Sequence, residues 1–140
     1  MKLEQQVCSL ELAQKLKELG VKQESYFAWN KFGSGEKGDD FEWSIKPVSE
    51  YRLASDRNCS AFTVAELGEM LPKEVNIPFK NGKPRAQNNV LKSYFGIGRT
   101  PQVIYAKTQG NEYIHIKEDT EADARAQMLI YLLENKLITL

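Results

Sequence analysis

The residues best suited to do chemistry lie in the stretch 80–99, which combines cations with aromatic rings. Its basic residues are Lys80, Lys83, Arg85, Lys92 and Arg99. No acidic residue stands among them; Tyr94 and Phe95 lie within the stretch and Tyr105 follows it. Cations beside exposed aromatic rings form single-strand nucleic-acid surfaces, because phosphates are neutralised and bases stack there. The alternative is a solvated segment whose charges are balanced by acidic residues elsewhere, and the sequence leaves both interpretations open.

Catalytic and metal chemistry have weaker support. His115 is the only histidine, and its neighbours Ile114 and Ile116 are predicted to face the core, so His115 is predicted to face solvent. General acid–base catalysis needs a partner and a cleft, and the sequence indicates neither. Cys8 and Cys59 lack the close spacing of a zinc or redox motif, which predicts two buried thiols in a reducing cytoplasm. We therefore predict no enzyme activity, no metal and no cofactor.

Two other features favour structure over chemistry. Gly96 and Gly98 precede Arg99, but a phosphate-binding loop needs its glycines before a helix, and the following segment is predicted to be a strand. An ordinary loop is the preferred interpretation. Trp29 and Trp43 could line a pocket for a planar ligand, whereas aromatic residues in alternating strands mostly fill the core.

The composition is that of an ordinary globular chain. Its 140 residues suit a single domain spanning 1–140. Lys plus Arg and Asp plus Glu number 19 each, so net charge argues neither for nor against nucleic acid. The N-terminus lacks the apolar core of a signal peptide, and no run approaches the roughly 18 apolar residues of a membrane span. We expect a cytoplasmic protein without membrane contact.

The central stretch 62–72 carries the most complete helix signals. Thr63 and Glu66 have the spacing of a capping box, in which each side chain accepts from the other residue's backbone amide. Leu67 and Leu71 continue an apolar stripe, and Pro72 ends the helix. A first helix is predicted at 10–19, with Ser9 as N-cap and a Schellman ending at Gly20.

The last helix, beginning near Thr120, has the widest apolar stripe. Its apolar residues are Ala122, Ala126, Met128, Leu129, Ile130, Leu132 and Leu133. Such a stripe predicts a helix packed on two sides, the second contact being the first helix or another subunit. Leu129 and Leu133 are the tentative interface residues for self-association.

Strand patterns lie between these helices. Alternation predicts strands at 26–32, 41–45, 75–79 and 90–95, and a hairpin of 101–107 with 112–117. The segment 47–58 has no clear pattern. Together, the predicted helices and strands indicate an α+β domain in which an antiparallel sheet of about five strands is packed by the N-terminal, central and C-terminal helices.

Three blocks resemble a family of small uncharacterised proteins of tailed bacteriophages, prophages and bacterial genomes. They are SLELAQKLKELGVKQES at 9–25, FTVAELGEMLP at 62–72 and TEADARAQMLIYLLEN at 120–135. The resemblance implies a soluble protein of phage or mobile-element origin, acting in the bacterial host cytoplasm. It implies no activity, cofactor or catalytic residue. The expected function is a non-enzymatic accessory protein that binds another protein or itself; the alternative is nucleic-acid binding through 80–99.

Overall fold

A computed structural model describes residues 1–32, 42–48, 58–75, 89–95, 100–106 and 113–140. The elements follow in the order η1 (Leu3–Gln5), α1 (Leu10–Glu18), β1 (Phe27–Phe32), β2 (Glu42–Pro47), β3 (Asn58–Ser60), α2 (Val64–Met70), β4 (Glu74–Val75), β5 (Asn89–Phe95), β6 (Pro101–Ala106), β7 (Tyr113–Lys117) and α3 (Glu121–Glu134). The predicted α+β class and the three helices are confirmed. Positions Ile77 and Phe79 of the predicted strand 75–79 lie outside the described residues.

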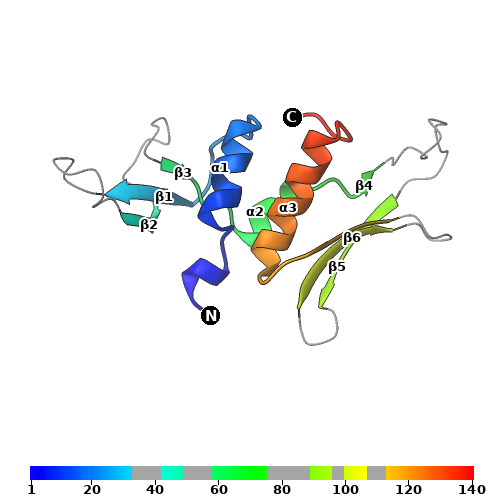
Figure 1. The fold of residues 1–140 in the computed structure, drawn as a ribbon, viewed down its shortest axis with the longest axis horizontal. Helices are drawn as coiled ribbons and strands as arrows, with labels where there is room; N and C mark the ends of the chain where they lie inside the picture. The colour runs from blue at the N-terminus through cyan, green and yellow to red at the C-terminus, as the bar shows by residue number, and fades with distance from the viewer. Residues whose placement is uncertain (33–41, 49–57, 76–88, 96–99, 107–112) are drawn as a thin grey trace.

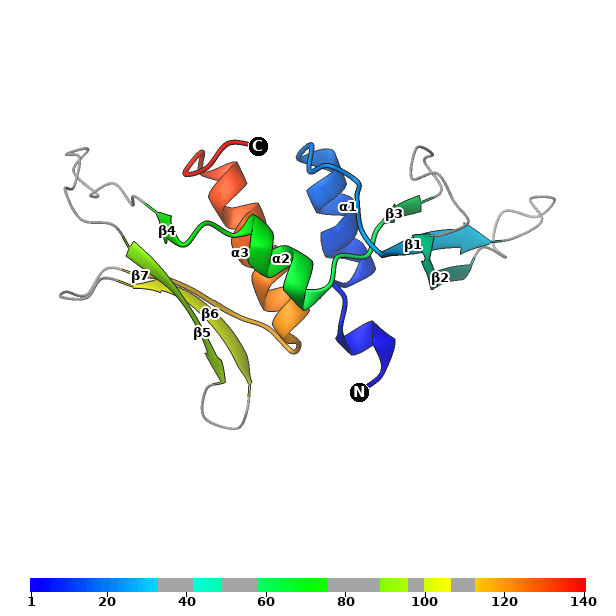
Figure 2. The same cartoon turned by 180° about the vertical axis from the view of Figure 1, so that it is seen from behind.

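The strands form two antiparallel sheets rather than one sheet of about five strands. β2, β1 and β3 make a three-stranded sheet in that order, and β4, β5, β6 and β7 make a four-stranded sheet. The helices lie between the two sheets (Figure 1), and the view from behind shows α2 crossing α3 on that side (Figure 2). The two sheets therefore lie on opposite sides of a shared helical layer.

β3 is the element that the sequence did not indicate. Cys59 pairs with Trp29 and Asn58 with Asn30, so this three-residue strand completes the first sheet beside β1. All three of its residues are buried. A strand this short and buried on both faces has no alternating pattern. Of the segment 47–58, Asn58 belongs to β3, and 49–57 lie outside the described residues.

The central helix forms as predicted. Thr63 Oγ1 accepts from the Glu66 amide at 3.2 Å, and a Glu66 carboxylate oxygen accepts from the Thr63 amide at 2.7 Å. The same carboxylate also accepts from the Tyr26 amide at 3.0 Å and from Ser25 Oγ at 3.1 Å. Glu66 therefore joins the start of α2 to the chain entering β1, a link between segments 40 residues apart in the sequence.

The first helix begins after its predicted N-cap, Ser9, and ends as predicted. The Val21 amide donates to Leu16 O and the Gly20 amide to Lys17 O, the two bonds of a Schellman motif. Gly20 has φ +85, the left-handed conformation that favours glycine. Ser9 occupies the N-cap position without a capping bond from its side chain. Its amide donates instead to Asp123 Oδ1 at 2.6 Å, which ties the start of α1 to the first turn of α3.

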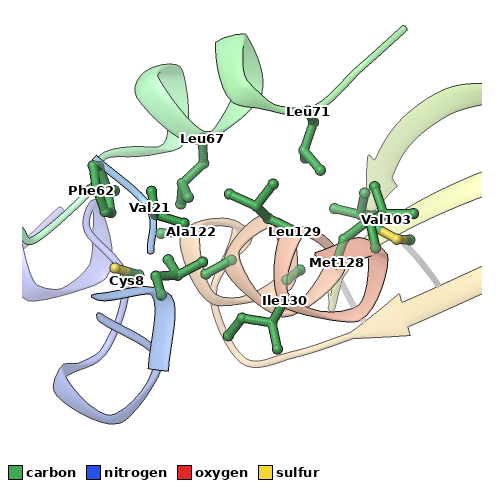
Figure 3. Packing of buried hydrophobic residues seen from close by; sticks show 14 of the residues in the cluster. Cys8, Val21, Phe62, Leu67, Leu71, Val103, Ala122, Met128, Leu129 and Ile130 are labelled. Atoms are coloured by element: carbon green, nitrogen blue, oxygen red, sulfur yellow. The ribbon is translucent and has the colours of Figure 1, made fainter. Parts of the chain in front are cut away.

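The last helix is packed on more than one side, as its stripe predicts. It contacts α1, α2, β6 and β7 of the same chain, so the second contact includes the first helix. Figure 3 shows Leu67 and Leu71 of α2 on one side of α3, and Val103 of β6 beside Met128. One buried cluster links residues from Cys8 to Leu132. Burial of this apolar surface is the main stabilising contribution to the fold.

Two positions, one in α2 and one just after α3, depend on the size or the backbone conformation of a single residue. A methyl group at Gly68 of α2 would occupy the space of the Arg125 guanidinium of α3, and Arg125 is held by Glu121 at 2.7 Å. Glycine at this position therefore leaves room for the Arg125 guanidinium where it lies. At the end of α3, the Leu137 amide donates to Leu132 O and Lys136 has φ 54, so a lysine stands where a Schellman ending favours glycine.

Candidate functional site

The four-stranded sheet has one face on the helices and one face directed away from them. Val103 and Tyr105 of β6 are completely buried, and their partners across the strands are Ile116 and Ile114 of β7. These residues form the inner face, beside α3. The alternate positions of the same strands form the opposite surface, which we call the outer face.

On β6 and β7, the outer face carries Gln102, Ile104, His115 and Lys117. His115 and Lys117 are exposed, which confirms the predicted orientation of His115. His115 Nε2 lies 2.6 Å from Gln102 Oε1. Because an amide oxygen can only accept, a hydrogen bond between them needs the ring proton on Nε2.

β5 adds two of the residues predicted from the sequence. The register places Lys92 opposite Ile104 and Tyr94 opposite Gln102. Residues directly opposite each other across antiparallel strands belong to the same face. Positions 92 and 94 therefore belong to the outer face, together with His115 and Lys117 of the strand on the other side of β6. One carboxylate also belongs there, because Glu74 of β4 stands opposite Val90.

The other predicted contact residues have different outcomes. Lys80, Lys83, Arg85 and Arg99 lie outside the described residues, as do Gly96 and Gly98. Tyr105 does not flank an exposed surface. Its ring is buried and its hydroxyl donates to Pro72 O at 2.6 Å, while burial raises the pKa of this hydroxyl. Tyr105 is therefore a core residue that joins β6 to the end of α2.

Lys117 and Gln102 were missed by the sequence analysis. Alternation within each strand separates His115 and Lys117 from Ile114 and Ile116, so the faces of the hairpin were predictable. The pairing of β5 with β6 connects segments separated by a loop, and no local pattern fixes that register.

A second surface lies between α1 and α3. The hydrogen bond from the Ser9 amide to Asp123 Oδ1 joins the first turns of the two helices. Near their last turns, Lys15 Nζ lies 3.2 Å from Glu134 Oε1. The two helices therefore run in the same direction, side by side (Figure 1). Between them is a groove of about 440 Å³. Its lining residues are Glu11, Leu12, Gln14, Lys15, Glu18, Gln127, Ile130 and Glu134.

The structure places the two tentative interface leucines inward. Leu129 is completely buried by its own chain, and Leu133 is partly buried against the same core. The packing of α3 on α1, α2, β6 and β7 accounts for the wide apolar stripe. Leu129 is therefore a core residue in this chain, and the stripe does not itself require a second subunit.

The surroundings of the cysteines and of Trp29 indicate that these side chains stabilise the fold. Cys8 and Cys59 are buried free thiols, as predicted. Burial raises the pKa of Cys8 to about 12 and that of Cys59 to about 11, which disfavours the reactive thiolate. The Trp29 indole donates to Cys8 O at 2.9 Å and packs against the core, whereas Trp43 lies at a hollow beside α1.

The described ranges contain neither a candidate metal site nor a candidate membrane span. There, no group of three or more His, Cys, Asp or Glu side chains is arranged to hold a metal ion. Among the described helices, none combines the length and the apolar content needed to cross a bilayer. Comparison with protein-family models, curated proteins and solved structures gives no match.

Proposed function

We propose that the protein is a non-enzymatic binding protein whose outer face binds single-stranded nucleic acid. The observation that carries the proposal is the strand register. It assigns Lys92 and Tyr94 of β5 to the same face as His115 and Lys117 of β7. Positions that carry cations and an aromatic residue on separate strands thereby share one face of the sheet.

The chemistry suits a flexible polyanion. Lysines neutralise phosphates without reading sequence, and a tyrosine can stack on any base because every base has a π-face. An antiparallel four-stranded sheet with helices on one face is also the platform on which RNA-recognition motifs stack bases, an analogy of architecture only. Besides Lys92, the sequence adds four cations and no acid across 80–99, which would strengthen the attraction to phosphate.

Support for a non-enzymatic role comes from the side chains that catalysis would use. The thiols of Cys8 and Cys59 are buried and held protonated. Reduced buried thiols are compatible with the cytoplasm. We extend the resemblance to phage-associated proteins to the same proposal: an accessory protein of phage or mobile-element origin in the host cytoplasm.

The experiment is fluorescence anisotropy with a labelled oligothymidylate at low salt. Tyr94→Ala and Lys117→Ala should each weaken binding by roughly fivefold to a hundredfold if a base stack or a phosphate contact is lost. Lys22→Ala is the matched control, because Lys22 is an exposed lysine that pairs with Glu24 away from the sheet. Equal affinities for all three variants and the wild type would contradict the proposal.

A second candidate function is binding of a partner protein. The observation that favours it is the groove between α1 and α3, whose charged lining residues are three glutamates and one lysine, a balance unsuited to phosphate.

A further inference from the structure

The groove between α1 and α3 is built from one face of each helix. Glu11, Gln14, Lys15 and Glu18 follow the spacing of a single face of α1. Gln127, Ile130 and Glu134 do the same on α3. Leu12 and Ile130 give the groove its apolar lining. Its volume of about 440 Å³ is within the range in which proteins bind small ligands or the anchoring side chains of a partner.

The charges of the groove are incompletely balanced. Lys15 and Glu134 neutralise each other at 3.2 Å. Glu11 and Glu18 are exposed, and within the described residues neither forms a salt bridge. They stand seven residues apart on α1, which is two helical turns or about 10 Å. The groove therefore presents two carboxylates at a fixed separation on one side of a partly apolar floor.

We infer that this groove docks a basic segment of a partner protein. The segment that fits is an amphipathic helix with two lysines or arginines seven residues apart and an apolar residue between them. Its cations would meet Glu11 and Glu18, and its apolar residue would contact Leu12 and Ile130. This is the helix-in-groove mode of recognition, with charge complementarity selecting the partner.

A nucleic acid does not fit this surface, because Glu11 and Glu18 would repel its phosphates. A second copy of the chain is the remaining occupant, and its association would appear as a change in mass. The groove is separate from the outer face, so this inference stands or fails independently of nucleic-acid binding.

The probe is a fluorescent helical peptide of about 15 residues, alanine-based, with two lysines seven residues apart and a leucine midway. Anisotropy should report binding that weakens as salt rises. Glu11→Gln with Glu18→Gln should weaken it about threefold to tenfold, the effect of losing two exposed ion pairs. The matched control is Glu24→Gln with Glu69→Gln, which removes the same charge from exposed positions outside the groove.

A second peptide with glutamates in place of the lysines should not bind. Chemical-shift changes at the Leu12 and Ile130 methyl groups should locate the lysine peptide in the groove, and they do not depend on any variant. Three results would overturn the inference: equal binding of the two peptides, no loss in the groove variant, or methyl shifts elsewhere. Sedimentation showing a dimer that Glu11→Gln with Glu18→Gln dissociates would assign the groove to a second copy instead and would also overturn it.

Discussion

Removal of the Glu66 carboxylate is the sharpest test of how the fold is held together. This side chain accepts from the Thr63 amide at 2.7 Å, from Thr63 Oγ1 at 2.8 Å, from the Tyr26 amide at 3.0 Å and from Ser25 Oγ at 3.1 Å. It caps α2 and also fixes the segment entering β1. A single substitution therefore affects two elements.

The expected magnitude follows from these bonds. Hydrogen bonds to a charged group contribute about 1.5–3 kcal/mol each when fully buried. Glu66 is only half-buried, so water replaces part of what is lost. The Ser25 hydroxyl can also donate to Ala61 O at 3.1 Å. We expect Glu66→Ala to lower the free energy of unfolding by about 2–3 kcal/mol and the melting temperature by roughly 5–10 °C.

Urea unfolding followed by far-UV circular dichroism and tryptophan fluorescence measures this effect. Glu66→Gln keeps one acceptor oxygen and should lose about half as much stability. Glu69→Ala on the same helix is the control; Glu69 is exposed and makes no hydrogen bond among the described residues, so its loss should stay within about 0.5 kcal/mol of wild type. A Glu66→Ala protein as stable as the Glu69→Ala protein would refute the reasoning.

The remaining predictions concern glycines, a helix end and the thiols. Gly68→Ala should gain little stability or lose some in the wild type, but should gain about 1 kcal/mol when Arg125→Ala has cleared the space, which a double-mutant cycle measures. Lys136→Gly should stabilise the protein by about 1 kcal/mol, because it relieves a left-handed residue at the end of α3. Unfolded thiols ionise near pH 9 while native Cys8 and Cys59 keep their protons, since burial raises their pKa. Stability should therefore be complete below about pH 9 and fall above it, up to about pH 11 for Cys59 and about pH 12 for Cys8, by up to about 1.4 kcal/mol per pH unit for each thiol.

Each of these has its own control. Additive effects of Gly68→Ala and Arg125→Ala would contradict the packing argument. Lys136→Ala removes the same charge without relieving the backbone, and an equal gain from it would contradict the conformational argument. Cys59→Ala should reduce the alkaline slope; an unchanged slope would show that other groups cause the loss.

Local signals explain which parts of the fold were predictable. The ends of α2 and α1 depend on residues three to six positions apart, so the capping box at Thr63 and the turn at Gly20 were both predicted. The pairing between segments far apart in the sequence was not predicted. The split into two sheets, the short strand β3 and the bond from Ser9 to Asp123 depend on contacts between segments far apart in the sequence, where pattern within one segment gives no information.

The candidate site shows the same limit. The exposure of His115 was predicted from alternation alone, and its neighbour Gln102 was not, because it stands on the adjacent strand. The width of the α3 stripe correctly predicted packing on two sides. It could not distinguish a contact within the chain from a contact with another subunit, since both bury the same residues.

The salt dependence of single-strand binding tests the central claim most directly. The affinity for an oligothymidylate should be measured at several salt concentrations for the wild type and for Lys92→Ala with Lys117→Ala. Each phosphate contact of a single strand contributes about 0.7 to the slope of log affinity against log salt. The double variant should bind more weakly, and its slope should be about 1.4 smaller. An unchanged slope, or a wild-type protein with no salt-dependent binding, would contradict it.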